Sequence, residues 1–299
     1  AIYNRVLNST EVQDLYNSGS GYSHTGSEEG LIEAWHFDES SWSYSNEWVY
    51  DECGLTNSTY QGVSGAGHQS RKDYPLLNKS FLFDGDDDYI EFNTTNNDLF
   101  NFDTDRVFSI CAWFKIPQDL SDTVTLISKT DQSNGMQGNG WSLIYNTDIH
   151  ALRMALNWDD GTDIKFVGYD SEKPLTDNQW HYTCFVQEQR DGTPNNNDAS
   201  FYIDGREDLN NVFTLGSSAS SDFNISGDQP LRIGARKNGG ELVDYWRGNI
   251  GEVSIFNYSL TSTEVQDLYY AGTVKYGGEF DITKEYTRIR YNFQTDNQY

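Results

Sequence analysis

Two short loops of the sequence carry dense clusters of carboxylates. One reads Asp84-Gly85-Asp86-Asp87-Asp88 and the other reads Asp159-Asp160-Gly161-Thr162-Asp163. Calcium takes about six to eight oxygen ligands from carboxylates and carbonyls gathered in a turn, so both loops are candidate calcium sites, and the first is the stronger. Neither loop has the ligand spacing of helix–loop–helix calcium proteins. In a chain with 46 acidic residues, solvated turn carboxylates remain the alternative for both.

Aromatic side chains beside loops indicate a second kind of chemistry, the binding of sugars. Sugar rings stack on aromatic faces while polar groups on loops held by a rigid scaffold bind the hydroxyls. Trp158 directly precedes the second acidic loop, and Trp141 directly follows a Gly- and Asn-rich stretch at 134–140. We therefore predict Trp158, Trp141 and Asp159 as ligand-binding residues. The Trp residues inside strand-like runs are expected in the core: Trp35, Trp113 and Trp180.

No arrangement of His or Cys predicts catalysis or a zinc site. The five His residues are scattered, and His181 follows a Trp in a strand-like run, which favours a packed or surface role. The three cysteines lack paired C-x-x-C spacing. Cys111 and Cys184 each lie in an apolar strand-like run, so we expect two small buried residues, and a single disulfide between them stays possible.

The charge of the chain excludes several classes of partner. The formal net charge is −26, so the field of the whole molecule repels nucleic acids and anionic lipid surfaces. No run of eighteen apolar residues occurs, so we expect no insertion into a membrane. Aromatics make up 15% of the chain against 22% charged residues, which is typical of a folded protein with a large core.

An internal repeat organises the chain. Residues 2–19 (IYNRVLNSTEVQDLYNSG) and 255–272 (IFNYSLTSTEVQDLYYAG) are identical at twelve of eighteen positions. Residues 287–293 also resemble residues 31–37 at a similar offset. We therefore predict that 1–24 is the tail of a preceding repeat, 25–277 is one whole module, and 278–299 is a linker and the start of a following repeat.

Within the module the residue pattern is almost entirely that of β-strands. Apolar and polar residues alternate in short runs, and Gly, Asn, Asp and Ser turns separate these runs. This pattern predicts an all-β fold, a two-sheet antiparallel sandwich with about a dozen strands. The repeated segment predicts one short C-terminal capping helix, with Thr261 and Glu264 as its capping box and Gly272 as its end.

Seven short motifs occur in a fixed order along the module. They are GLIEAWHFDE at 30–39, FDG at 83–85 with Asp88-Tyr89, FSICAWFK at 108–115, WHYT at 180–183, FYIDG at 201–205, LRIG at 231–234 and GNIGEVSIFN at 248–257. In this order they resemble the LamG-like jelly-roll family within the concanavalin A-like lectin and glucanase fold. The resemblance covers nearly all of residues 30–272, which favours that fold, although a fold alone does not define a function.

The resemblance implies a structural calcium ion and argues against catalysis. Relatives of this fold often bind calcium through residues that correspond to Asp38, Asp84 and Glu252, although Gly251 here replaces a carboxylate of the usual closing motif. Glucanases of this fold carry two carboxylates close together on one strand. The nearest such string, at 279–285, lies after the module and has its second Glu one position too late.

These observations predict a non-catalytic glycan-binding or adhesion module of a tandem-repeat protein, secreted or displayed on a cell or virion surface. Its expected partners are a polysaccharide or glycoconjugate and neighbouring repeats of the same protein. One alternative is a structural spacer or shell unit of a surface layer, filament or virion. Another is an accessory domain of a polysaccharide-active enzyme.

Overall fold

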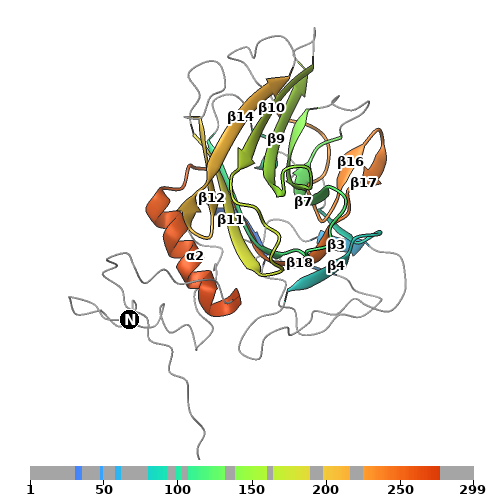
Figure 1. The fold of residues 1–299 in the computed structure, drawn as a ribbon. Coiled ribbons are helices and arrows are strands. Elements are labelled where there is room, and N and C mark those ends of the chain that lie inside the picture. Colours follow the sequence, from blue (N-terminus) through green and yellow to red (C-terminus); the bar gives the residue numbers. More distant parts are fainter. Residues whose placement is uncertain are drawn as a thin grey trace, which may run out of the picture.

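Alternating apolar and polar residues form antiparallel strands along most of the chain (Figure 1). The computed structural model describes residues 31–35, 48–49, 58–61, 80–92, 99–102, 107–131, 139–159, 164–188, 198–215 and 225–276. The strands form two large sheets and one small hairpin. The prediction of an all-β jelly-roll sandwich with one short helix is confirmed.

One sheet has seven strands and contains both ends of the module. β18 lies between β1 and β6, and Trp35 pairs with Val253 where β1 meets β18. The first and last strands of the module are therefore direct neighbours. The strands of this sheet are β1 (Leu31–Trp35), β18 (Arg247–Phe256), β6 (Phe108–Lys115), β11 (Trp180–Gln187), β12 (Ala199–Ile203) and β13 (Arg206–Glu207), with β4 (Phe81–Asp84) also pairing with β18.

The other large sheet has nine strands. Its middle is a meander in which β7, β8, β9 and β10 pair in the order of the sequence. The strands in spatial order are β14 (Leu209–Leu215), β10 (Ile164–Ser171), β9 (Ala151–Asp159), β8 (Gly140–Asn146), β7 (Val124–Lys129), β15 (Arg232–Ile233), β5 (Tyr89–Phe92), β3 (Ser58–Gln61) and β2 (Trp48–Val49). The hairpin consists of β16 (Arg236–Asn238) and β17 (Glu241–Val243).

The core lies between the two large sheets. Because successive side chains of a strand point to opposite faces, one apolar set from each strand fills this space. The seven-stranded sheet contributes Phe114, Phe185 and Ile255, and the nine-stranded sheet contributes Leu156 and Tyr169, all fully buried.

The single described helix, α2 (Ser262–Tyr276), covers the outer face of the seven-stranded sheet and lies against β11 and β13 (Figure 1). Beneath it is a second apolar cluster on the outer face of the sheet, which we call the lid cluster. The lid cluster consists of Cys111, Trp113, Tyr182, Cys184, Val186, Tyr202, Phe256, Leu260, Val265 and Tyr269.

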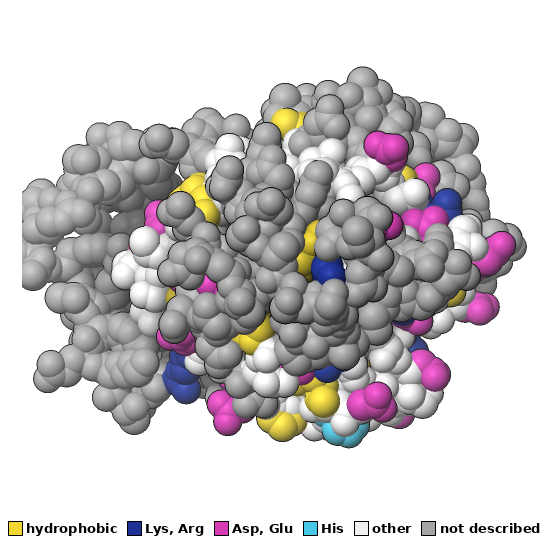
Figure 2. Space-filling view, turned by 90° about the horizontal axis from the view of Figure 1, so that it is seen from above, with side chains coloured by type: hydrophobic (Ala, Val, Ile, Leu, Met, Phe, Trp, Pro, Cys, Tyr) yellow, Lys and Arg dark blue, Asp and Glu magenta, His cyan; other side chains and the backbone are white. Residues whose placement is uncertain are grey.

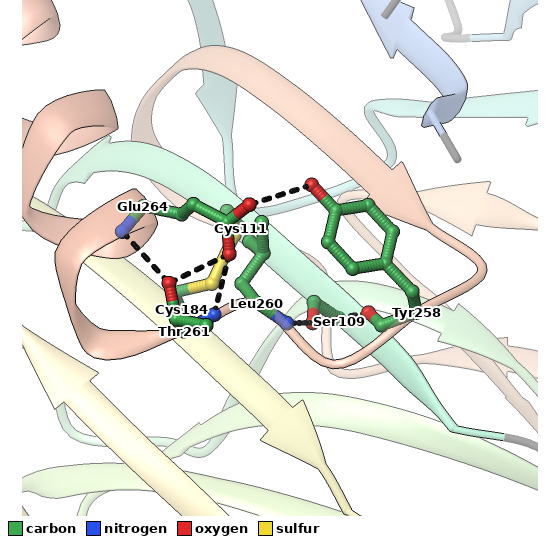
Figure 3. Close-up of a disulfide and its surroundings, with 7 residues drawn as sticks. All are labelled: Ser109, Cys111, Cys184, Tyr258, Leu260, Thr261 and Glu264. Atoms are coloured by element: carbon green, nitrogen blue, oxygen red, sulfur yellow. Dashed lines mark hydrogen bonds between the residues drawn. A yellow bond between two sulfur atoms is a disulfide. The ribbon is translucent and has the colours of Figure 1, made fainter. Parts of the chain in front are cut away.

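The start of α2 is capped as the sequence predicts. The Thr261 hydroxyl accepts a hydrogen bond from the Glu264 backbone N–H at 3.3 Å, and the Thr261 N–H donates to Glu264 Oε2 at 2.7 Å. Figure 3 shows Glu264 also contacting the Tyr258 hydroxyl, which donates at 3.5 Å. Ser109 of β6 receives the Leu260 N–H at 2.9 Å, so the connector into the helix is fixed to the sheet.

The predicted end of the helix was wrong. α2 continues past Gly272 to Tyr276. A Cβ on Gly272 would clash with the indole Nε1 of Trp113, so the glycine allows the helix to approach the sheet. Close packing against Trp113, rather than termination of the helix, explains this residue.

Cys111 and Cys184 form a disulfide beneath α2 (Figure 3). They are opposite one another in the paired strands β6 and β11, and both are fully buried. The sequence leaves open whether these cysteines are two free buried residues or a disulfide pair, and in the structure they form the disulfide. Disulfides persist in oxidising compartments.

Candidate functional site

The acidic turn between β4 and β5 brings three carboxylates together. Oxygens of Asp84, Asp87 and Asp88 lie within 4.8 Å of one another. Gly85 enters the turn with φ at 87°, a conformation that favours glycine. All three residues belong to the first acidic loop that the sequence predicts as a calcium site.

Backbone amides already hold two of these carboxylates. The Asp84 N–H donates to Asp88 Oδ2 at 3.0 Å, and the Asp86 N–H donates to Asp84 Oδ1 at 2.8 Å. Asp88 is 1% exposed, whereas Asp84 is exposed. Together these bonds fix the conformation of the turn.

Two partly exposed tyrosines flank the acidic turn. The rings of Tyr89 and Tyr245 are 6.4 Å apart and tilted by 51°. Burial raises the pKa of Tyr245, and the nearby Tyr89, Asp87 and Asp86 raise it further. At neutral pH the Tyr245 hydroxyl is therefore protonated and can donate a hydrogen bond beside the carboxylates.

The predicted calcium ligand Glu252 does not join this turn. In the register of β4 and β18, Asp84 is opposite Arg247, and Glu252 is five residues further along β18. Five extended residues span about 16 Å, so Glu252 lies well away from the turn. Burial raises the pKa of Tyr182 in the lid cluster, and the charge of Glu252 raises it further. Asp38 lies outside the described residues.

The two tryptophans predicted to stack on a ligand are in the core, which corrects that prediction. Trp158 is 1% exposed and Trp141 is 0% exposed, and Trp141 Nε1 donates to the Phe100 carbonyl at 3.1 Å. A sugar has no access to either indole face. The alternation of the sequence indicates this burial. Trp158 is on the same strand face as Leu156 of β9, and Trp141 is on the same face as Leu143 of β8.

Asp159 lies at the end of β9 and is exposed, on the face opposite to Trp158. Its backbone N–H donates to Asn139 Oδ1 at 2.8 Å. The loop that follows it lies outside the described residues. On the same face of β9, Asn157 is fully buried, and among the described residues neither polar atom of its side-chain amide has a hydrogen-bond partner.

His181 has a structural position, as the sequence predicts. Nδ1 of its ring is 2.9 Å from Asp204 Oδ2, and Nε2 is 2.9 Å from Asp177 Oδ1. Lys173 Nζ also contacts Asp204 Oδ2, at 2.6 Å. Because two carboxylates occupy both ring nitrogens, the imidazole has no nitrogen free to take a proton from a substrate.

Carboxylates also dominate the visible described surface. Figure 2 shows Asp and Glu side chains spread over one face, with fewer Lys and Arg among them. Among the described residues, no helix has the length and apolar character needed to cross a membrane.

A two-sheet jelly roll with an outer capping helix and an acidic turn at a sheet edge defines the class of this protein. Residues 84–266 match the family model described as the concanavalin A-like lectin/glucanases superfamily. The match spans more than half of the chain, and the chain belongs to this family.

Several solved structures share the fold. The receptor-binding domain of botulinum neurotoxin D has a TM-score of 0.54 and 17% sequence identity, over 84% of this chain and 56% of that one. The binding domain of Paraclostridial Mosquitocidal Protein 1 has a TM-score of 0.53 and 17% identity, over 81% of this chain and 52% of that one. At this identity the similarity shows the fold alone.

A third similar structure is the botulinum neurotoxin serotype D ligand-binding domain in complex with N-acetylneuraminic acid. Its TM-score is 0.50 at 17% identity, over 81% of this chain and 50% of that one. The chain thus spans about half the length of these structures. A comparison with curated protein sequences found no match.

Proposed function

We propose that this chain is a non-catalytic glycan-binding or adhesion module of a tandem-repeat protein, working outside the cell or on a virion surface. The observation that carries the proposal is the acidic turn, where Asp84, Asp87 and Asp88 lie beside the tyrosine pair Tyr89 and Tyr245. Aromatic faces and hydrogen-bonding groups at one surface position are what sugar recognition requires.

Calcium fits the donors of this turn. Hard carboxylate oxygens are the ligands that calcium prefers, and three of them lie within 4.8 Å of one another. We propose that Asp84, Asp87 and Asp88 hold the ion. When bound, it would neutralise the turn and supply a positive centre for sugar hydroxyls.

The charge of the turn restricts the ligand. A negatively charged sugar would approach three carboxylates on a chain with a net charge of −26. We therefore expect neutral glycans to bind directly, and acidic glycans to bind only with a divalent cation between them and the turn.

Two further observations support the proposal. Several proteins of the same fold are described as receptor-binding or ligand-binding domains, one of them with a bound sialic acid. The disulfide between Cys111 and Cys184 is consistent with an oxidising, extracellular location.

A glycan array with the whole chain tests the proposal, with calcium and with chelator. We expect retention of a set of neutral glycans, and loss of that retention in Tyr89→Ala and Tyr245→Ala. Ile149→Ala is the control, because Ile149 is an exposed apolar side chain in the turn between β8 and β9. Equal retention by all three variants would place the glycan elsewhere, and no retention of any glycan would contradict the proposed function.

The repeat favours one rival function, a structural spacer or shell unit. Such a unit would retain no glycan and would bind only other copies of the module. An accessory domain of a polysaccharide-active enzyme would bind the same glycans, but its parent chain would carry a catalytic domain. Glycan retention by the isolated chain therefore distinguishes a spacer from a glycan-binding module or an accessory domain. The sequence of the parent chain then distinguishes the glycan-binding module from the accessory domain.

A further inference from the structure

The contact between α2 and the outer face of the seven-stranded sheet gives the repeated segment a structural meaning. In this contact α2 and its connector supply Leu260, Val265 and Tyr269 to the lid cluster, with Leu268 packed at its edge. Gly272 lies against Trp113. These five residues dock α2 on the sheet, and Tyr270 adds a contact at the edge of the cluster.

The N-terminal segment retains every one of these docking residues. Aligned on the repeat, their counterparts are Leu7, Val12, Leu15, Tyr16 and Gly19. The capping pair is retained in kind, since Glu11 corresponds to Glu264 and Asn8 to Thr261, and Asn is also a favoured N-cap residue.

The differences between the two copies fall at other positions. Tyr270 corresponds to Asn17, and Ala271 corresponds to Ser18. Tyr270, like Leu268, packs at the edge of the lid cluster, so the N-terminal copy lacks this one edge contact, and Ala271 is partly exposed. Residues 7–19 therefore have the side chains needed to occupy the position of α2.

The strand part of the repeat cannot exchange in the same way. Ile255, the counterpart of Ile2, is paired on both sides, with Glu33 of β1 and with Ile110 of β6. Replacing it would open the middle of the sheet. Only the helix and its connector can therefore be replaced, with residues 7–19 taking the place of residues 260–272.

We propose that the outer face of the seven-stranded sheet is a docking site for residues 7–19 of the same chain, which compete there with α2. We assign the docking segment to the same chain because β1, which follows it in the sequence, lies beside this face. Leu31 pairs with Phe256 and packs against the lid cluster. The twelve residues from Gly19 to Leu31 reach at most about 40 Å, which keeps the segment close to its docking site.

This inference deepens the tandem-repeat part of the proposed function and is independent of glycan binding. In an array, each module would have two candidate lids, its own and that of the preceding repeat. Exchange of lids would then link the stability of neighbouring modules.

The test uses the whole chain and three sets of substitutions. The first, Val265→Asp with Tyr269→Ala, weakens the packing of α2 on the sheet, so that α2 is disabled as an occupant of the face. The second, Val12→Asp with Tyr16→Ala, disables the N-terminal copy, and the third combines both. Competition predicts that the second set alone leaves the melting temperature unchanged, because α2 occupies the face. In the combined variant, the second set then lowers the melting temperature further, so that the two sets are not additive.

A second measurement does not depend on global unfolding. The Cys111–Cys184 disulfide is buried beneath the lid, so its rate of reduction reports how often the face is uncovered. In a Cys53→Ser background, we expect the disulfide of the combined variant to be reduced about tenfold faster than that of the variant with α2 disabled. This ratio corresponds to a tenfold larger fraction of molecules in which the face is uncovered. Equal melting temperatures and equal reduction rates in these two variants would overturn the proposal.

A matched pair of substitutions tests the geometry of docking. With α2 disabled, Gly19→Leu should act like the second set, because a side chain at this position would meet Trp113. Asp14→Ala should have no effect, because its counterpart Asp267 is exposed. Light scattering identifies the source of the segment: a monomer supports docking within the chain, whereas a concentration-dependent dimer would reject it. Glycan retention tests the proposed function separately.

Discussion

Cys111 of β6 and Cys184 of β11 are directly opposite in neighbouring strands, and their disulfide lies between the seven-stranded sheet and α2. The bridge joins residues 73 positions apart in the sequence. It therefore closes a long loop of the unfolded chain at a place where the folded chain already holds the two strands together.

Removal of this bridge should destabilise the fold. For a loop of 73 residues, the chain-entropy model gives a stabilisation of about 4 kcal/mol as an upper value. We expect Cys111→Ala with Cys184→Ala to lower the free energy of unfolding by about 2–4 kcal/mol in urea titrations. Reductant should destabilise the wild-type chain by a similar amount and leave the double variant unchanged. A reductant effect in the double variant would assign the response to Cys53.

The network of Asp177, His181 and Asp204 should make stability depend on pH. Burial lowers the pKa of His181, but the hydrogen bond and charge of Asp204, together with Asp177, raise it more, so the net pKa lies above 6.5. The folded state thus binds this proton more tightly than the unfolded chain does. Its stabilisation is complete below pH 6.5 and is lost as the pH rises through the raised pKa.

The two carboxyl groups of this network give a second limit at low pH. Burial raises the pKa of Asp204, but the hydrogen bond and charge of His181 and the contact with Lys173 lower it to a net value below 3.8. Stability from Asp204 is therefore lost as the pH falls through its lowered pKa. His181→Gln should reduce stability by about 1–3 kcal/mol at neutral pH and flatten the alkaline side of the profile. Asp177→Asn, at a half-exposed carboxylate, should have the smaller effect. An unchanged profile in His181→Gln would contradict this assignment.

Chelation should lower the melting temperature if the acidic turn holds calcium. An ion that binds only the folded state at 100 times its dissociation constant adds about 2.7 kcal/mol. Asp84→Asn should remove most of this response, while its amide oxygen can still accept the Asp86 N–H. Asp159→Asn, at the far end of β9, is the control. Equal melting with calcium and chelator at fixed ionic strength would reject the site.

Gly272→Ala should destabilise the protein, contrary to helix propensity. In an exposed helix, the replacement of Gly by Ala is favourable by about 1 kcal/mol. Here the added methyl would clash with Trp113, and overpacking of this kind costs about 1–3 kcal/mol. Thermal unfolding measures the sign. Asp267→Ala on the exposed side of α2 should change stability by no more than about 0.5 kcal/mol.

Asn157→Leu should be neutral or stabilising. The Asn157 side chain is fully buried, and in the part of the chain that the structure describes neither its amide nitrogen nor its oxygen has a hydrogen-bond partner. An unsatisfied buried polar group costs about 1–3 kcal/mol, which an apolar residue of similar size avoids. Urea titration decides the sign, with Ser142→Ala as a smaller change at another buried, unpartnered group of the nine-stranded sheet. Marked destabilisation by Asn157→Leu would show that the amide is bonded in solution.

The sequence by itself determined the fold class, the capping box of the helix that follows β18, and the repeat. These are local properties, because strand alternation, helix periodicity and caps depend on residues a few positions apart. The phase of β8 and β9 also determines that Trp141 and Trp158 point inward, a signal that outweighs their position beside loops.

Only the tertiary structure decided which distant residues meet. The register of β4 on β18 separates Glu252 from Asp84, and the register of β6 on β11 places Cys111 opposite Cys184. The approach of α2 to Trp113 decided that Gly272 lies within the helix. Cross-strand register and helix docking depend on loop lengths and on packing summed over the whole core, so no short stretch of sequence contains them.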